Sequence, residues 1–269
     1  MRTVIVIPSR YGSTRFPGKP LAPVAGRSLL ERVWRIARAV RGVERVLVAT
    51  DDDRIAAHTR SFGGEAVATP ESCRNGTERA EAAVQALDFT PDAVINLQGD
   101  AVLTPPWVVQ AVVDTLAADT LRGKLNGRHA DIVTPATVLD EGAVARLAAA
   151  KAGGEVGGTT VTVGLDGFAL YFSKAIIPFR RDPAKAPVRK HIGLYGFRRE
   201  ALARIVALPP TPLELAEGLE QLRALEHGLG VRVVEVDLRG RSTIAIDAPA
   251  DVARVEAAIA REGELVPAN

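Results

Sequence analysis

The sequence predicts an α/β fold: a single Rossmann-like, mostly parallel sheet flanked by helices. Short runs rich in Val and Ile, typical of buried parallel strands, alternate with amphipathic stretches of helical period. Their order over the first 70 residues, strand then helix, favours right-handed crossover units. With 269 residues and 47% hydrophobic content, the chain is long enough for one large core. We therefore expect one domain over residues 1–269, with an excursion at about 159–200.

Composition narrows the class of partner. The 34 Lys and Arg nearly balance the 32 Asp and Glu, so the net charge of +2 gives no field suited to nonspecific nucleic-acid binding. Aromatic content of 4% argues against base-stacking platforms. The single cysteine, Cys73, excludes an internal disulfide and fits a reducing compartment. No signal sequence or bilayer-length apolar run is present, so we expect a cytoplasmic protein without nucleic-acid or membrane partners.

The first half of the chain predicts a series of strands and helices. The first helix places Leu29, Val33 and Ile36 on one apolar face, and Gly42 ends it. Pro105 and Pro106 open the last helix of the series. Strands are expected at 4–7, 43–49, 65–68 and 93–97, and helices at 28–40, 54–62, 80–86 and 108–116.

The second half has weaker signals. Asp166 and Gly167 form a turn pair typical of a hairpin, here between strands at 159–163 and 169–172. A basic, proline-containing loop follows at 178–190. A helix at 213–225 is expected to turn four leucines inward, at positions 215, 219, 222 and 225. Further strands are expected at 131–138, 231–236 and 243–246, and helices at 142–152 and 252–261.

The loop after the first strand has the composition of a phosphate-binding loop. Arg10, Arg15 and Lys19 stand among glycines and prolines directly after a buried strand, where α/β sheets bind ligands. It is not a P-loop, because five residues separate Gly12 from Gly18 and a proline follows Lys19. Our hypothesis is that it grips a nucleoside triphosphate; a solvated basic loop is the alternative.

Two carboxylates are candidate metal ligands. Asp100 follows the strand at 93–97 and a glycine, the position of a ligand crevice, although an Asp there also suits a turn. Asp247 ends the expected strand at 243–246, where the sequence leaves a helix cap and a site residue equally open. The three consecutive carboxylates at 51–53 are better explained as caps of the next helix than as a metal cluster.

Two further segments leave alternatives open. In residues 74–79, Thr77 fits a helix N-cap, while Arg74 and Arg79 flank a glycine turn and supply donors for a base edge or phosphates. A lone histidine such as His191 is more often structural than catalytic. Four scattered histidines and one cysteine have no zinc-ligand spacing.

Seven segments, in this order along nearly the whole chain, resemble the 3-deoxy-manno-octulosonate (Kdo) cytidylyltransferases, also called CMP-Kdo synthetases. They are PSRYGSTRFPGKPL from Pro8, NGTER from Asn75, LQGD ending at Asp100, ALYFSKAIIP from Ala169, HIGLYGFR from His191, PLELAEGLEQLR from Pro212 and IDAPADVARV from Ile246.

The resemblance implies a sheet of the nucleotide-diphospho-sugar transferase type and a CTP-dependent nucleotidyltransferase of lipopolysaccharide biosynthesis. The sugar acid's anomeric hydroxyl would attack the α-phosphorus in line, releasing pyrophosphate. It also implies a homodimer formed through residues 159–197, so that the excursion would serve sugar binding and dimerisation.

The resemblance further implies roles for individual residues. Asp100 and Asp247 would hold Mg²⁺ and, with Lys19 and Arg10, carry catalysis. The implied nucleotide contacts are Arg10, Ser13, Arg15, Lys19, Gly76, Thr77, Arg79 and Gln98. The implied contacts to the acidic sugar are Arg180, His191, Tyr195, Glu220 and Gln221.

The sequence also departs from the family pattern. Ala101 and Val102 follow Asp100 where the family has Glu and Pro, and Asn75 stands where serine is usual. Residues 122–158 match poorly and lack the usual Asn-Pro-Asn. A cytidylyltransferase for another or amino-substituted sugar acid, another hydroxyl acceptor, and a noncatalytic nucleotide-binding homologue therefore stay open.

Overall fold

The structure, a computed structural model, describes residues 1–12, 15–122 and 129–266 and divides into two compact units. Unit 1 comprises Met1–Val113 and Leu238–Asn269, and unit 2 comprises Asp114–Asp237. The first boundary falls within helix α4 (Pro106–Arg122).

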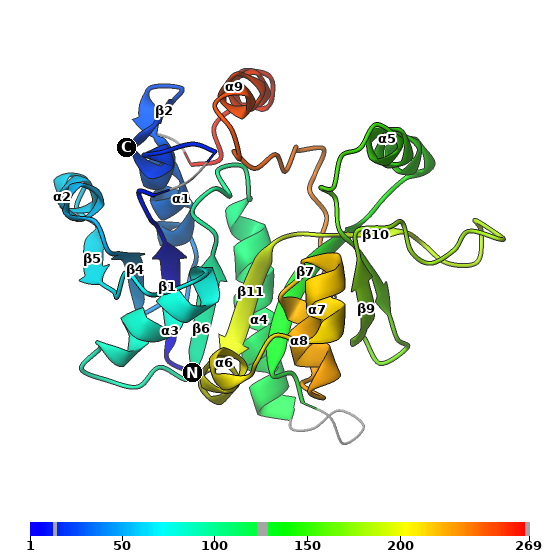
Figure 1. Cartoon of the computed structure of the whole chain (residues 1–269), viewed down its shortest axis with the longest axis horizontal. Helices are drawn as coiled ribbons and strands as arrows, with labels where there is room; N and C mark the ends of the chain where they lie inside the picture. The colour runs from blue at the N-terminus through cyan, green and yellow to red at the C-terminus, as the bar shows by residue number, and fades with distance from the viewer. Residues whose placement is uncertain (13–14, 123–128, 267–269) are drawn as a thin grey trace. The chain divides into compact units, whose positions relative to one another are not determined.

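Unit 1 is built on a parallel sheet of four strands. Their order is β5-β4-β1-β6, seen side by side in Figure 1. The bounds are β1 Thr3–Pro8, β4 Arg45–Thr50, β5 Glu65–Ala68 and β6 Ala93–Leu97. The side chains of Val4, Ile5, Val6 and Ile7 are fully buried, as expected for a strand covered on both faces. Because all four strands run the same way, their carboxyl ends meet at one edge.

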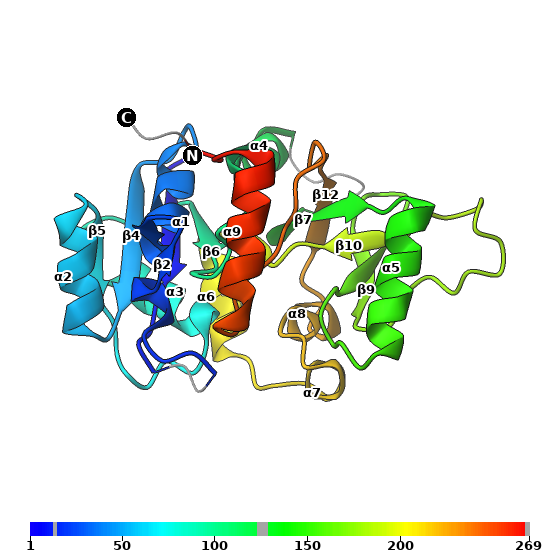
Figure 2. The same ribbon diagram turned by 90° about the horizontal axis from the view of Figure 1, so that it is seen from above.

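The helices of this sheet begin at polar caps. Ser28 caps α1 (Leu29–Arg38), and Asp52 caps α2 (Asp53–Ser61), which packs against β5 (Figures 1 and 2). The cap of α3 (Gly76–Gln85) is Asn75, whose Oδ1 accepts from the Glu78 amide at 2.8 Å. The prediction of Thr77 as the N-cap is therefore wrong, because the helix begins one residue before it.

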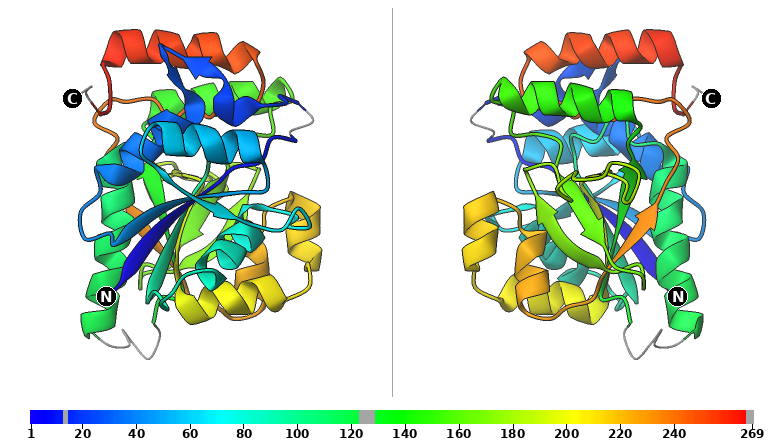
Figure 3. Two further views of the ribbon diagram at one scale, coloured as in Figure 1. Left: turned by 90° about the vertical axis from the view of Figure 1, so that its left-hand side faces the viewer. Right: turned by 90° about the vertical axis from the view of Figure 1, so that its right-hand side faces the viewer.

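The remaining elements of unit 1 flank its first loop. The short helix η1 (Lys19–Leu21) leads into a hairpin of β2 (Pro23–Val24) and β3 (Arg27–Ser28). Helix α9 (Ala250–Glu262) contacts β2, as the left panel of Figure 3 shows. The predicted strand at 243–246 is wrong: these described residues form no strand, and the Ile246 carbonyl accepts from the Lys19 side chain instead.

Unit 2 contains a mixed set of strands (Figure 3, right panel). Their order is β11-β7-β10-β8-β9, and each neighbouring pair in this order is antiparallel. Strand β12 pairs with β7 in parallel. The predicted hairpin turn is confirmed, since Asp166 accepts from the Phe168 amide and Gly167 has φ of 81°. The bounds are β7 Ile132–Val138, β8 Thr160–Val163, β9 Ala169–Ser173, β10 Arg189–His191, β11 Leu194–Arg198 and β12 Val231–Glu235.

One predicted helix of unit 2 is divided in two. Helix α7 (Pro212–Glu217) ends at Gly218, whose φ of 61° is left-handed, and α8 (Gln221–Glu226) follows. Leu222 is fully buried but Leu215 is 71% exposed, so the expected inward row of leucines at 213–225 is wrong in its first half. The other helices are α5 Glu141–Ala152 and α6 Arg199–Ala207.

The predicted fold class, α/β with a mostly parallel sheet flanked by helices, is confirmed, and its parallel core lies in unit 1. The division into one domain with an excursion at about 159–200 stays a prediction. Within the described chain, no helix is long and apolar enough to cross a membrane.

Candidate active site

A pocket of about 330 Å³ opens at the carboxyl ends of β1 and β6 in unit 1. This is the edge at which open α/β sheets bind ligands. The wall includes the first loop, the start of α3 and the segment before α9. Its lining residues are Pro8, Ser9, Arg10, Arg15, Lys19, Pro20, Cys73, Arg74, Asn75, Gly76, Arg79, Gln98, Gly99, Asp100 and Asp247.

The first loop is held in shape by its own backbone and by one aromatic ring. The Gly18 amide donates to the Tyr11 carbonyl at 3.0 Å, and Gly18 has φ of 70°. A side chain on Gly18 would meet the Tyr11 ring at 3.2 Å. The Arg54 guanidinium covers the same ring at 3.3 Å from its centroid. These contacts fix the backbone that carries Lys19 into the pocket.

Lys19 joins the two ends of the site. Its ammonium donates to Asp100 Oδ2 at 3.0 Å and to the Ile246 carbonyl at 2.8 Å. The Lys19 side chain is only 17% exposed, and that of Asp100 is 30% exposed. The ammonium thus places the carboxylate after β6 close to the residue that precedes Asp247.

Asp247 faces the same pocket from the segment before α9. Its Oδ1 accepts from Arg15 at 3.2 Å, a pair that is largely exposed. The start of α9 is served by another carboxylate, because Asp251 accepts from the amides of Asp247 and Ala248 at 2.9 Å each. These backbone bonds, above all that from Ala248, hold the pKa of Asp251 below its usual value. The Asp247 side chain is therefore not the cap of this helix.

Two glycines allow the strand ends to come together. A Cβ on Gly99 would lie 2.8 Å from the Pro8 carbonyl oxygen, and one on Gly76 would lie 3.1 Å from Pro8 Cγ. The same added Cβ on Gly76 would lie 3.2 Å from Gln98 Oε1. The ends of β1 and β6 and the start of α3 thus pack closely at these glycines and form the floor of the pocket.

The α3 wall carries a buried guanidinium. Arg79 is 3% exposed and donates to Thr69 Oγ1 and to Asp51 Oδ2, each at 2.6 Å. Thr77, two residues before Arg79, is also buried, and Asn96 Nδ2 donates to the Thr77 hydroxyl at 3.4 Å.

This geometry can be compared with known proteins. The family model of the cytidylyltransferases matches residues 4–235. The chain belongs to the cytidylyltransferase family. It is 56% identical over 267 residues to 3-deoxy-manno-octulosonate cytidylyltransferase of Maricaulis maris, covering 99% of this chain and 100% of that one. The enzyme of this name from Myxococcus xanthus is 43% identical over 265 residues, covering 97% and 98%.

A solved structure agrees with the sequence relatives. It is a CMP:2-keto-3-deoxy-manno-octonic acid synthetase complexed with CTP, with a TM-score of 0.85 and 35% identity over 97% of this chain and 100% of that one. This cytidylyltransferase chain therefore shares the fold of a CTP-binding relative over nearly its whole length.

Most predicted nucleotide and metal residues come together in this pocket. Of the candidates, Thr77 is not among the described residues that line it, and Ser13 lies outside the described residues. Those that line it are Arg10, Arg15, Lys19, Gly76, Arg79, Gln98, Asp100 and Asp247. Their individual roles stay predictions.

The donor set fits Mg²⁺. This ion takes oxygen ligands, keeps several waters and is commonly bound by one or two carboxylates together with substrate phosphates. Asp100 and Asp247 line one pocket, and the Lys19 ammonium already pairs with Asp100 there. The described residues contain no group of three or more His, Cys, Asp or Glu suited to a metal. Among the described residues, no metal site is therefore formed by protein side chains alone.

The predicted sugar contacts lie in unit 2, where several form one cluster. Tyr195 donates to Gln221 Oε1 at 3.0 Å, and the Tyr195 and His191 rings are 5.5 Å apart between centroids. Burial, followed by the charge of Glu220, raises the pKa of Tyr195. Arg180 has a different described partner, since it donates to Glu141 at 2.5 Å.

His191 is neutral in this cluster. Burial lowers its pKa to about 3. The Thr134 hydroxyl donates to the Leu194 carbonyl at 2.8 Å, so the 2.7 Å contact with His191 Nε2 requires that nitrogen to donate to Thr134. Nδ1 is then the hydrogen-bond acceptor of the ring.

Sequence reasoning missed several residues of the site, Ser9, Cys73 and Asp51 among them. Ser9 and Cys73 line the pocket, and Asp51 holds Arg79. Ser9 directly follows β1, so its position was a usable signal. No sequence signal pointed to Cys73 or Asp51, because the residues around them in the fold come from distant parts of the chain.

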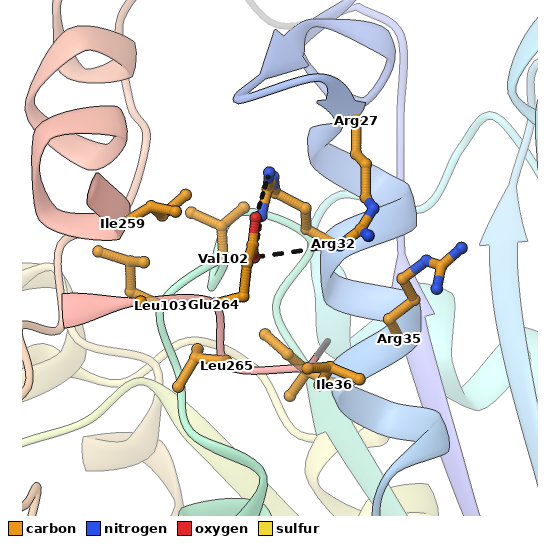
Figure 4. A pocket seen from close by; sticks show the side chains of 11 residues that line it. Arg27, Arg32, Arg35, Ile36, Val102, Leu103, Ile259, Glu264 and Leu265 are labelled. Atoms are coloured by element: carbon orange, nitrogen blue, oxygen red, sulfur yellow. Dashed lines mark hydrogen bonds and ion pairs between the residues drawn. The ribbon is translucent and has the colours of Figure 1, made fainter. Parts of the chain in front are cut away.

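A second pocket of unit 1 has a structural role (Figure 4). It measures about 20 Å³, enough for about one water molecule. Glu264 points into it and accepts from Arg32 at 2.8 and 3.2 Å. Arg32 is 6% exposed and also donates to the carbonyls of Val24 and Ala25, so the C-terminal segment is fastened to the β2–β3 hairpin.

Proposed function

We propose that this cytidylyltransferase couples CTP to 3-deoxy-manno-octulosonate, giving the CMP-sugar and pyrophosphate. The observation that carries the proposal is the pocket in which Lys19, Arg10 and Arg15 meet Asp100 and Asp247. The names of the relatives and the CTP complex of the structural neighbour support the choice of substrates.

The pocket supplies what a triphosphate requires. Three cationic side chains from the first loop can offset phosphate charge, and Gly76 and Gly99 line the same pocket. Arg79 and Gln98 add hydrogen-bonding groups on the same wall. We assign the nucleotide to this pocket, with Lys19 and Arg10 beside the pyrophosphate that leaves.

The reaction is one in-line displacement at phosphorus. The anomeric hydroxyl oxygen of the sugar acid forms a bond to the α-phosphorus, and the bond from that phosphorus to the pyrophosphate oxygen breaks. The hydroxyl proton passes to solvent. Such a transfer depends on positioning and charge neutralisation, so no covalent nucleophile is needed.

Asp100 and Asp247 would hold Mg²⁺. When bound, the ion neutralises phosphate charge and polarises the α-phosphorus. Lys19, bonded to Asp100 and to the Ile246 carbonyl, keeps the carboxylate and the segment before Asp247 in place.

The sugar acid contacts are proposed from unit 2. His191 offers an acceptor at Nδ1, and Tyr195 and Gln221 offer polar groups in the same cluster. Glu220 and Arg180 complete the proposed set. Val102, the second residue after Asp100, stands where the family has Pro; it is 3% exposed and therefore packs in the core.

We also propose that the protein is a homodimer acting in the cytoplasm, where CTP is available, in lipopolysaccharide biosynthesis. Strand β9 ends the strand order of unit 2, and its Leu170 is 64% exposed. An exposed apolar residue on a terminal strand favours pairing with another chain. Light scattering on the wild type and Leu170→Glu tests this: a dimer converted to a monomer is expected, and a monomeric wild type refutes it.

The substrate is tested by pyrophosphate release. The enzyme, CTP and Mg²⁺ are incubated with a panel of sugar acids that includes Kdo and an 8-amino-substituted analogue, with UTP replacing CTP as the matched control. We expect the highest kcat/KM with CTP and Kdo. Preference for another sugar acid would overturn the assigned acceptor, and no turnover with any of them would overturn the proposed reaction.

A further inference from the structure

We propose that Asp51 is a positioning residue that holds Arg79 in the wall of the nucleotide pocket. The inference rests on the proposed function, because it assigns to this pocket the binding of CTP.

Asp51 and Thr69 fix the Arg79 guanidinium from two neighbouring strands. Asp51 directly follows Thr50, the last residue of β4, and Thr69 directly follows Ala68, the last residue of β5. The two strand ends are joined by the Thr69 amide, which donates to the Thr50 carbonyl at 2.9 Å. Arg79 donates to each acceptor at 2.6 Å, so the first turn of α3 is tied to the carboxyl edge of the sheet.

The carboxylate at position 51 is not used as a helix cap. The cap of α2 is Asp52, whose Oδ1 accepts from the Arg54 amide at 2.9 Å. Two adjacent carboxylates therefore have separate roles: Asp52 begins the helix, and Asp51 turns toward a guanidinium 28 positions later in the chain.

The burial of the Asp51–Arg79 ion pair makes the loss of either partner costly. The Arg79 side chain is 4% exposed and that of Asp51 is 16% exposed, so the ion pair lies largely out of water. A buried guanidinium that loses its carboxylate is costly to keep in place, and it gains by moving toward solvent or another acceptor.

The pair leaves Arg79 able to bind a ligand. A guanidinium has five N–H donors, and the bonds to Asp51 and Thr69 use two of them. Arg79 lines the pocket, whereas Asp51 is not among the described residues that do. Asp51 therefore acts through Arg79, by lowering the conformational entropy that the guanidinium loses when CTP binds.

Three variants test the proposal. Asp51→Asn removes the charge with little change of shape, and Asp51→Glu keeps the charge. Asp53→Asn is the matched control, because it removes an exposed charge two residues away. CTP binding is measured by calorimetry with Mg²⁺ and without sugar acid, and thermal melting is recorded for each variant.

We expect Asp51→Asn to raise the Kd for CTP about tenfold, the scale of one charge-assisted hydrogen bond. The KM for the sugar acid should stay unchanged and kcat should fall by less than about threefold. Asp51→Glu should recover part of the affinity, and Asp53→Asn should bind like the wild type. A lowered melting temperature with an unchanged Kd for CTP would show a merely structural role and overturn the inference.

The calorimetric readout separates this inference from the proposed function. If the wild type binds CTP but releases no pyrophosphate with any sugar acid, the proposed reaction fails while the variants still test Asp51. If the wild type binds no CTP at millimolar concentration, both are overturned.

Discussion

Lys19 Nζ lies 3.0 Å from Asp100 Oδ2 and donates to the Ile246 carbonyl at 2.8 Å. One ammonium therefore joins the first loop, the end of β6 and the segment that leads to Asp247. These parts are separated by 81 and 227 positions in the sequence. Because the Lys19 side chain is 17% exposed, this is a partly buried contact rather than a surface pair.

Replacing Lys19 with Met should remove both contacts and the cation nearest the proposed metal site. We expect kcat/KM for CTP to fall by at least about 100-fold, because phosphate charge is no longer offset. Arg60→Met, which removes an exposed cation from α2, is the control and should change little. Steady-state kinetics with varied CTP measure both, and equal losses would refute a specific role for Lys19.

The close approach of β1 and β6 can be tested at Gly99. A Cβ there would lie 2.8 Å from the Pro8 carbonyl oxygen, so Gly99→Ala must push the strand ends apart. We expect at least about a tenfold loss of kcat, since small displacements at a reaction centre are costly. Gly157→Ala, with no atom within 4 Å of the added Cβ, is the matched control. Wild-type kinetics for Gly99→Ala would contradict this account of the pocket floor.

The fastening of the C-terminal segment can be tested through Glu264. Glu264→Gln leaves the buried Arg32 without its charged partner, although two backbone carbonyls remain. We expect urea denaturation to show a loss of about 2 kcal/mol in the free energy of unfolding. Glu44→Gln, which breaks an exposed pair with Arg2, should have a much smaller effect. Equal effects of the two substitutions would count against the fastening.

His191 should make folding sensitive to acid. Its folded pKa is about 3, below the usual value of 6.5, so below pH 6.5 the unfolded chain binds a proton that the folded chain excludes. The free energy of unfolding should therefore fall as the pH drops from 6.5 toward 3, with a limiting slope of about 1.4 kcal/mol per pH unit. Above pH 6.5 this group contributes no pH dependence.

Denaturation of the wild type and His191→Gln between pH 4 and 7 measures this contribution. The wild type should lose stability more steeply below pH 6 than the variant does. Parallel curves for the two proteins would show that His191 does not exclude a proton in the folded state.

Much of unit 1 could be predicted because its signals are local. Buried strands such as 4–7 and 93–97 are nearly continuous apolar runs, and parallel strands bring their carboxyl ends to one edge. That geometry explains why Lys19 and Asp100, which both follow such strands, line one pocket. Gln98 lines it too, but its place there was predicted from the family resemblance.

Other features depend on tertiary contacts that leave no local pattern. Asp51, Asp52 and Asp53 all suit a cap, and only the position of Arg79 separates Asp51 from its neighbours. Residues 243–246 alternate as a strand would, yet the Ile246 carbonyl pairs with a side chain. The leucine spacing in 213–225 runs through Gly218, so periodicity alone could not locate the break.

The central claim is that Asp100 and Asp247 together form the reaction centre for cytidylyl transfer. The most direct measurement is CMP-Kdo formation from CTP and Kdo, followed by ³¹P NMR, for Asp100→Asn, Asp247→Asn and the exposed control Asp53→Asn. We expect both site variants to melt like the wild type and to lose at least about 100-fold in rate, because each loses a negative Mg²⁺ ligand. The control should keep its activity. Wild-type rates in either site variant would contradict the claim.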